Sequence, residues 1–177
     1  MNKKLGILFR ISGLPGSGKT EVAKLIHPKI NKIFGPTIMY SGDDLRKITN
    51  NNSYTLKDRF NFGIQNIALI KLINAQKINV IFATVGLSSK IRKKLKKEIP
   101  NYIEITIKSE VSDLKKRKDR KFYNDNSKHV WGRDIKVEYP KKSDVVLIND
   151  FKKNLNHMKN NIFNDLTKLK KLKNFII

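Results

Sequence analysis

The strongest constraint on this chain is the eight-residue stretch Gly13–Thr20, which reads GLPGSGKT. The stretch fits a phosphate-binding template, a glycine followed by four residues and then by Gly-Lys-Ser/Thr. Glycines let the backbone turn its N–H groups around an anion, and the following helix adds the positive end of its dipole. We expect Lys19 to reach the β- and γ-phosphates of ATP and the Thr20 hydroxyl to ligate Mg²⁺. The predicted ATP-binding residues of the loop are Gly13, Leu14, Pro15, Gly16, Ser17, Gly18, Lys19 and Thr20.

Both flanks of this loop support a nucleotide site. Before it, apolar residues dominate from Leu5 to Ile11, as expected for a strand that is buried on both faces. After it, Val22, Ala23 and Ile26 recur at helical spacing, and Pro28 is expected to interrupt the pattern, so that Ile30 and Ile33 lie on a kink or a new turn. A chance glycine-rich turn is the alternative, and the order strand, loop, helix argues against it.

The remaining sequence alternates short apolar runs with longer amphipathic segments. Further strands are expected at Thr37–Tyr40, Val80–Ala83, Tyr102–Lys108 and Val145–Ile148. Helices are expected at Leu56–Gln76, from a cap at Ser88 or Ser89 to Lys97, from a cap at Ser109, and at Phe151–Lys173. The inner face of the long helix is predicted to carry Phe60, Ile64, Ile67, Ala68, Ile70, Leu72 and Ile73.

This alternation predicts an α/β fold in which a parallel sheet of five strands lies between two layers of helices. We expect a single domain over residues 1–177, with a lid or substrate loop at about 117–142 and a C-terminal helix at about 151–173. The segment Phe122–Lys142 lacks clear periodicity, which is typical of such a loop.

Composition limits the possible partners. Lys and Arg number 38 against 15 Asp and Glu, for a net charge of +23, which suits either a nucleic-acid surface or a proteome-wide lysine bias. We favour the bias and expect no nucleic-acid partner, because the charge is spread from Lys3 to Lys173 without an aromatic stacking motif. The absence of cysteine excludes disulfides and thiolate metal sites. No apolar run is long enough for a membrane span, and we expect a cytoplasmic protein.

Ligands of parallel sheets bind at the carboxyl ends of the strands, where we expect four segments to meet. These segments are the loop at Gly13, the segment at Asp43, the turn at Val85 and the basic run at Arg117. Asp43 and Asp44 directly follow the second strand, so at least one could hold Mg²⁺ or accept a proton from an attacking hydroxyl. An Asp-rich helix cap is the alternative, and both roles can hold at once. Asp43 and Lys19 are the predicted catalytic residues.

Basic and aromatic side chains supply the remaining candidates. Arg46 and Arg59 could clamp a substrate phosphate in bidentate fashion, or form surface ion pairs of little value. Arg117, within the run Lys115–Lys121, could contact the triphosphate of ATP or belong to a solvated basic face.

Two aromatic residues of the unpatterned loop, Trp131 and Phe122, could stack on a base, and Trp131 could equally fill a core edge. The three histidines lack ligand spacing, so we expect no zinc site. No strand ends in an Asp-Glu pair and no Asn-Lys-x-Asp motif is present. These absences favour a small-molecule phosphoryl transferase over a motor ATPase or a GTPase switch.

In this order and spacing, the motifs resemble those of the adenylylsulfate (APS) kinase family over nearly the whole chain, from Leu5 to Asn149. The family's Asp-Gly-Asp-Asn-x-Arg is similar to Ser41–Arg46, and its helical Asp-Arg to Asp58-Arg59. Its Arg-Asp-Pro-Lys-Gly-Leu-Tyr segment is similar to Arg117–Tyr123, and a later glycine-containing loop to His129–Ile135.

The resemblance implies a P-loop kinase-like fold and a reaction that uses ATP and Mg²⁺ to phosphorylate the ribose 3′-hydroxyl of a nucleotide with a sulfated 5′ end. It also implies that Asp43 is a base or metal-linked carboxylate, and that Arg46 and Arg59 grip the 5′ phosphoryl group of the acceptor. The partner is then a small nucleotide. The oligomeric state stays open, a homodimer included.

The departures from the family lie on the substrate side. Three single residues differ: this chain has Ser41 where the family has Asp, Phe62 where it has Asn, and Asn124 where it has Lys. Two short segments also differ, because the family's Phe-Ile-Ser-Pro corresponds to Thr84–Leu87 and its Phe-Thr-Gly to Val130–Gly132. This pattern implies the same reaction on a changed acceptor, and it resembles the family's capsule-pathway branch, which acts on cytidine diphosphoramidate. An adenylylsulfate kinase that makes 3′-phosphoadenylylsulfate, and a basic nucleic-acid-binding P-loop ATPase, are the alternatives. The predicted substrate-binding residues are Asp43, Arg46, Arg59, Phe62, Val85, Gly86, Val130 and Trp131.

Overall fold

A computed structural model describes residues 1–117, 123–125, 128–152 and 155–176. Within these residues the core is a sheet of five strands in the order β2-β3-β1-β4-β5, and every neighbouring pair is parallel. The strands are β1 (Leu8–Gly13), β2 (Thr37–Ser41), β3 (Asn79–Thr84), β4 (Tyr102–Lys108) and β5 (Val145–Ile148). The predicted sheet is confirmed.

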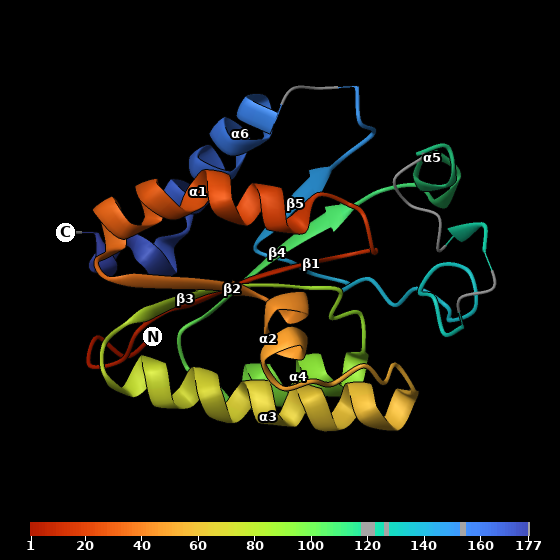
Figure 1. The fold of residues 1–177 in the computed structure, drawn as a ribbon. Coiled ribbons are helices and arrows are strands. Elements are labelled where there is room, and N and C mark those ends of the chain that lie inside the picture. The colour runs from red at the N-terminus through yellow and green to blue at the C-terminus, as the bar shows by residue number, and fades with distance from the viewer. Residues whose placement is uncertain (118–122, 126–127, 153–154, 177) are drawn as a thin grey trace.

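Helices cover both faces of the sheet (Figure 1), which confirms the three-layer α/β/α arrangement. One layer contains α1 (Lys19–Phe34) and α6 (Leu155–Lys168), and the other contains α3 (Leu56–Ala75) and α4 (Ser89–Glu98). Shorter helical segments are α2 (Gly42–Ile48), α5 (Val111–Lys115) and the 3₁₀ helix η2 (Lys170–Phe175). None of the helices in the described ranges is long and apolar enough to cross a bilayer.

The central strand β1 is buried on both faces, which explains its nearly continuous apolar sequence. Phe9 and Ile11 pack into the cluster under α1 and α6, while Leu8 packs into the cluster under α3 and α4. Side chains alternate along a strand, so Arg10 lies on the same face as Leu8. This alternation places a fully buried charge beneath the α3–α4 layer.

Helix α1 continues through Pro28 to Phe34, so the prediction that a new turn begins after the proline is wrong. A proline inside a helix removes one backbone hydrogen bond. The residues on either side, Ile26 and Ile30, are both fully buried in the core. The apolar area that they remove from water offsets that loss, so the helix persists.

The prediction for the inner face of α3 is partly wrong. Phe60 and Leu72 are 40% and 63% exposed, and Ala68 is also exposed. The buried residues of the helix are Phe62, Asn66, Ile67, Ile70 and Asn74. The helix thus has two asparagines on its inner face and two large apolar residues on its outer face. For this reason the apolar periodicity of the sequence does not identify the buried face correctly.

Two predicted helix ends need correction. The C-terminal helix ends at Lys168 and is followed by the separate segment η2, in which Leu172 is buried. Helix α5 has Glu110, not Ser109, at its N-cap position. Ser88 is the N-cap of α4, one of the two predicted positions, but its side chain makes no capping hydrogen bond. The backbone N–H of Ser89 donates to Glu138 Oε2 at 3.1 Å.

A capping box begins helix α2, directly after β2. Ser41 Oγ accepts a hydrogen bond from the Asp44 N–H at 3.1 Å, and Asp44 Oδ2 accepts one from the Ser41 N–H at 2.9 Å. The Ser41 hydroxyl also donates to Asp44 Oδ2 at 2.7 Å. These bonds, the hydroxyl first, lower the pKa of Asp44 below its usual value.

Replacing this carboxylate should therefore weaken the fold in a pH-dependent way. We expect Asp44→Ala to lower the free energy of unfolding by about 0.5–1 kcal/mol at pH 7. Because the folded pKa of Asp44 is lowered, its contribution is present above the unfolded pKa and is lost as the pH falls through the folded value. Urea unfolding at pH 7 and at about pH 3 checks this. An equal difference between wild type and variant at both pH values would contradict it.

Candidate active site

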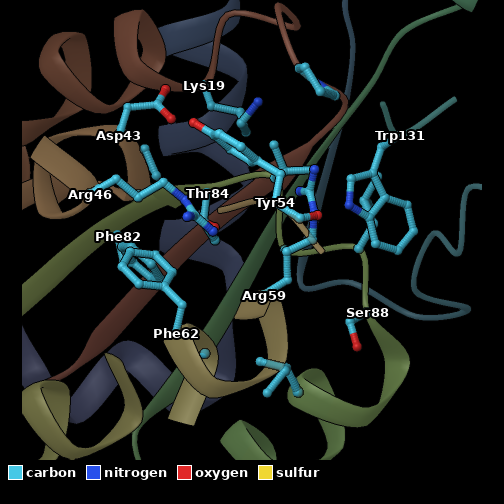
Figure 2. A pocket seen from close by; sticks show the side chains of 18 of the residues that line it. Lys19, Asp43, Arg46, Tyr54, Arg59, Phe62, Phe82, Thr84, Ser88 and Trp131 are labelled. Carbon is cyan, nitrogen blue, oxygen red and sulfur yellow. The ribbon is translucent and has the colours of Figure 1, made fainter. Parts of the chain in front are cut away.

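A cavity of about 580 Å³ opens at the carboxyl ends of β1, β2 and β3 (Figure 2). Three of the four segments expected to meet at this edge do line it, namely the glycine loop, the start of α2 and the turn after β3. In the fourth, the described residues Lys115, Lys116 and Arg117 do not line it, and the Arg117 guanidinium carbon lies 4.7 Å from the centroid of the Phe151 ring. The ATP contact of Arg117 stays a prediction, and Lys118–Phe122 lie outside the described residues.

The glycine loop has the backbone of a phosphate cradle. Gly16 and Gly18 have φ angles of +79° and +89°, a region that favours glycine. A Cβ at Gly13 would lie 2.5 Å from the carbonyl oxygen of Ile107, so that position needs glycine as well. The 16-residue helix α1 begins at Lys19, within the last residues of this stretch, and its first N–H groups have no intrahelical partner. The loop therefore fits an anionic phosphate chain.

Two contacts from distant parts of the chain hold this loop. Asn149, just after β5, donates from Nδ2 to the Ser17 carbonyl at 3.0 Å. Tyr123 donates its hydroxyl to the Pro15 carbonyl at 3.0 Å. Neither contact was predicted. The residues that they join are 132 and 108 positions apart in the sequence, and no local pattern indicates contacts at such separations. Ser17 Oγ is buried and lacks a hydrogen-bond partner within the described ranges, which leaves it available to a ligand.

Lys19 and Asp43 lie together at this end of the cavity. Lys19 is 9% exposed, lines the cavity and donates from Nζ to the Leu14 carbonyl at 2.7 Å. The carboxylate of Asp43 points toward Lys19 (Figure 2). The cap of α2 is made by Ser41 and Asp44, so the expected helix-cap role belongs to Asp44, and Asp43 lines the cavity.

Oxygen donors suited to Mg²⁺ also lie at this end. Thr20 and Asp43 both line the cavity, and their hydroxyl and carboxylate oxygens are the ligand types that this hard cation takes. Mg²⁺ usually keeps several waters and is shared with substrate phosphates, so two such side chains suffice for a fit.

Arg46 is rigidly positioned between two aromatic rings. Its guanidinium carbon lies 4.4 Å from the centroids of both Tyr54 and Phe62. NH1 donates to the carbonyls of Asn51 and Ser53 at 3.1 and 2.7 Å and to Asn51 Oδ1 at 3.0 Å. Among the described residues these bonds all come from NH1, so Nε and NH2 remain for a ligand in the cavity.

Arg59 joins the start of α3 to the loop that carries Trp131. Its Nε donates to the Tyr54 carbonyl and its NH2 to the His129 carbonyl, both at 2.8 Å. Burial, and secondly the positive charge of Arg46, lower the pKa of Arg59. Two neighbouring cations at one cavity wall destabilise each other until an anion binds between them, so this wall suits a phosphoryl group.

The predicted aromatic and loop residues also line the cavity. Phe62, Val130 and Trp131 are each less than 9% exposed. Trp131 packs against Leu14 and its neighbours in a small apolar cluster, as the core interpretation expected, and it also faces the cavity. Its stacking on a base stays a prediction. Val85 and Gly86 lie in the turn after β3. Phe122, the other predicted stacking residue, lies outside the described residues.

A buried ion pair beneath the cavity was not predicted. Arg10 NH1 donates to Glu104 Oε1 at 2.8 Å and to the Tyr102 hydroxyl at 3.1 Å, and NH2 donates to the Gly86 carbonyl. A Cβ at Gly86, where φ is +48°, would lie 2.2 Å from Arg10 NH2. The pair fixes the turn that replaces Phe-Ile-Ser-Pro. The sequence contains one signal for this pair. Arg10 and Glu104 each lie inside an apolar strand, and a charge that is buried there must be paired with an opposite charge.

Comparisons with known proteins agree with this geometry. The family model for adenylylsulphate kinase matches residues 5–148 of the 177 in the chain. A cytidine diphosphoramidate kinase from Campylobacter jejuni subsp. jejuni serotype O:2 is 29% identical over 149 residues, which cover 82% of this chain and 87% of that relative.

Solved structures share the fold. The APS kinase CysC of Mycobacterium tuberculosis, determined with AMPPNP and APS, superposes with a TM-score of 0.81 at 20% identity and covers 93% of this chain and 99% of its own. A gluconokinase from Sinorhizobium meliloti 1021 has a TM-score of 0.62 at 18% identity, with 96% of both chains covered. The resemblance that the motifs suggested is therefore confirmed, and the chain belongs to the adenylylsulphate kinase family of P-loop kinases.

Proposed function

We propose that this protein transfers the γ-phosphoryl group of ATP to the ribose 3′-hydroxyl of a modified nucleotide, and that the acceptor is cytidine diphosphoramidate. One observation carries the proposal. A single cavity has the phosphate loop with Lys19 and Asp43 at one end and the paired guanidinium groups of Arg46 and Arg59 on its wall. Such a cavity can hold two phosphate-bearing molecules with a hydroxyl of one near the γ-phosphate of the other.

The residues at the loop end of the cavity have separate roles in phosphoryl transfer. The backbone N–H groups of the glycine loop and Lys19 hold the donor phosphates and stabilise the charge that develops on the transferred group. Thr20 and Asp43 would hold Mg²⁺, which would supply positive charge to the donor phosphates. Asp43 would serve either as a ligand of that metal or as the base that takes the proton of the 3′-hydroxyl, while the hydroxyl oxygen bonds to the γ-phosphorus and the bond from that phosphorus to ADP breaks.

The acceptor end supports a nucleotide with a 5′ phosphoryl chain. Arg46 and Arg59 bind that chain, and Trp131 stacks on the base. Phe62 and Trp131 reduce the space that a purine needs, which favours a smaller pyrimidine. The C. jejuni relative, which is named for cytidine diphosphoramidate, supports the same choice.

Trp131→Ala should raise the Michaelis constant for the acceptor by at least about 5-fold and leave that for ATP nearly unchanged. Base–aromatic stacking contributes roughly 1–3 kcal/mol, and only the acceptor loses it. Phe175→Ala, which removes an aromatic ring outside the cavity, is the matched control and should change neither constant. Steady-state kinetics with each substrate varied in turn measures this, and a larger effect on ATP would contradict the placement of the base.

The acceptor is tested by an ADP-release screen with cytidine diphosphoramidate, adenylylsulfate and plain nucleoside diphosphates. We expect kcat/KM to be at least about 10-fold higher for cytidine diphosphoramidate than for adenylylsulfate. If adenylylsulfate is the better acceptor, the protein is an adenylylsulfate kinase that makes 3′-phosphoadenylylsulfate. If neither is phosphorylated while RNA or DNA stimulates ATP hydrolysis, it is a basic nucleic-acid-binding ATPase.

A further inference from the structure

The inner end of the cavity lies beyond the two arginines, between α3, α4 and the sheet. Its lining side chains are nearly inaccessible to solvent, at 0–8% exposed, yet they face the cavity. Most of them are apolar, as in any small-molecule site, where a few polar groups decide what binds. The residues are Arg10, Phe62, Asn66, Phe82 and Ile91.

Asn66 presents an unpaired acceptor at this inner end. It is 4% exposed, and its Nδ2 donates to the Phe62 carbonyl at 2.7 Å. A carbonyl can only accept, so this bond fixes which way the amide points. Its Oδ1 is buried and has no hydrogen-bond partner in the described part of the chain. A buried acceptor without a hydrogen bond lowers the free energy of unfolding, and a ligand that supplies a donor removes this penalty.

Arg10 supplies a matching donor. Its NH1 and NH2 are taken by Glu104, Tyr102 and the Gly86 carbonyl, whereas its Nε is buried and finds no acceptor among the described residues. The Glu104 carboxylate pairs with Arg10 NH1 at 2.8 Å and with the ammonium group of Lys96 at 3.3 Å. Of the polar atoms at the inner end, one donor and one acceptor thus stay without a partner among the described residues, and a group that bears acceptor oxygens alone would leave the acceptor unpaired.

The order of residues along α3 indicates which part of the acceptor reaches this end. Arg59, Phe62 and Asn66 follow one another on the face of the helix that lines the cavity, and Asn66 lies slightly more than one turn, about 6 Å, beyond Phe62. With the base at Trp131 and the first 5′ phosphoryl group at Arg46 and Arg59, the next group along the 5′ chain lies at Asn66. A base at the inner end is the competing arrangement.

We propose that Asn66 selects the terminal group of the 5′ chain, with Oδ1 accepting a hydrogen bond from the N–H of a phosphoramide and Arg10 Nε donating to its phosphoryl oxygen. This rests on the proposed function. A sulfate or an ionised terminal phosphate carries only acceptor oxygens, so it leaves Oδ1 unpaired and facing another oxygen. Asn66 would thus distinguish acceptors by their terminal atom, independently of the base.

Two acceptors that differ only in that atom test the inference. Cytidine diphosphoramidate ends in NH₂ where cytidine diphosphate ends in oxygen, and the base is the same. We expect wild type to prefer the amidate by at least about 10-fold in kcat/KM. Asn66→Leu keeps the approximate volume and removes the acceptor, so the preference should fall to near one, mostly through loss of activity on the amidate.

Two further variants keep the test interpretable. Asn66→Ser retains a donor that can reach the Phe62 carbonyl, and its shorter side chain then holds the hydroxyl oxygen against the helix backbone, away from the position of Oδ1. This variant should also abolish the preference, even if the leucine variant folds poorly. Asn74→Leu is the matched control, because Asn74 is equally buried on the same helix and its Oδ1 is also without a described partner, but it does not line the cavity. It should retain the wild-type preference.

The outcomes separate this inference from the proposed function. If wild type phosphorylates neither acceptor, the proposed function fails. If wild type phosphorylates both equally well, or if both Asn66 variants keep the preference, the nucleotide kinase stands and the role of Asn66 is refuted. A base at the inner end would instead make the Asn66 variants lose activity on both acceptors by the same factor, which also refutes it.

Discussion

Lys19→Ala is expected to lower turnover with ATP by at least about 10²-fold while the protein remains folded. The ammonium group of Lys19 lies at the loop end of the cavity, near Asp43, and in the proposed reaction charge develops there on the transferred phosphoryl group. In this structure it also donates to the Leu14 carbonyl at 2.7 Å, and loss of one such bond costs the fold little.

Turnover is measured by coupled ADP release, and folding by thermal unfolding of the same preparation. Lys24→Ala is the matched control, because Lys24 belongs to the same helix but is 59% exposed and forms a surface ion pair with Glu21. Near-normal turnover in the Lys19 variant would refute the assignment of the loop to ATP. A comparable loss in the Lys24 variant would show that the effect is not specific to the site.

Asp43→Asn is expected to lower turnover by about 10²- to 10⁴-fold and to affect ATP binding much less. The substitution keeps the shape of the side chain and removes its charge, so it eliminates both proton acceptance and metal binding through a carboxylate. Asparagine caps helices as well as aspartate does, so a structural role would tolerate the change.

The neighbouring residue separates catalysis from capping. Asp44 is one position along the same helix and makes the capping box with Ser41. Asp44→Asn should therefore reduce stability slightly and leave turnover near wild type. Full activity in the Asp43 variant, or equal losses in both variants, would indicate that this segment is structural and would remove Asp43 from the catalytic residues.

Local patterns in the sequence predict the sheet and the loop end of the site well. The glycine spacing of the phosphate loop, the apolar strand before it and the helix after it are all contained in about 30 residues, so they can be recognised without knowing the fold. Asp43 and Arg46 could be placed for the same reason, because they follow a strand whose carboxyl end must lie beside the loop.

The inner end of the cavity could not be predicted, because it depends on strand order and helix rotation. Arg10 and Glu104 meet only because β1 and β4 are neighbours, although 94 positions separate them. Asn66 was assigned no role, because an apolar periodicity through Phe60 and Leu72 pointed to a different face of α3. Packing against the sheet buries Asn66 and leaves those two residues exposed, a tertiary effect that helical periodicity does not contain.

The most direct test of the account is the identity of the product. The protein is incubated with ATP, Mg²⁺ and cytidine diphosphoramidate, and the nucleotides are separated and examined by mass spectrometry and ³¹P NMR. We predict one equivalent of ADP for each new phosphomonoester, with the added phosphate on the ribose 3′-oxygen and the phosphoramide intact. ADP without a phosphorylated nucleotide, or a phosphate added at another position, would contradict the account.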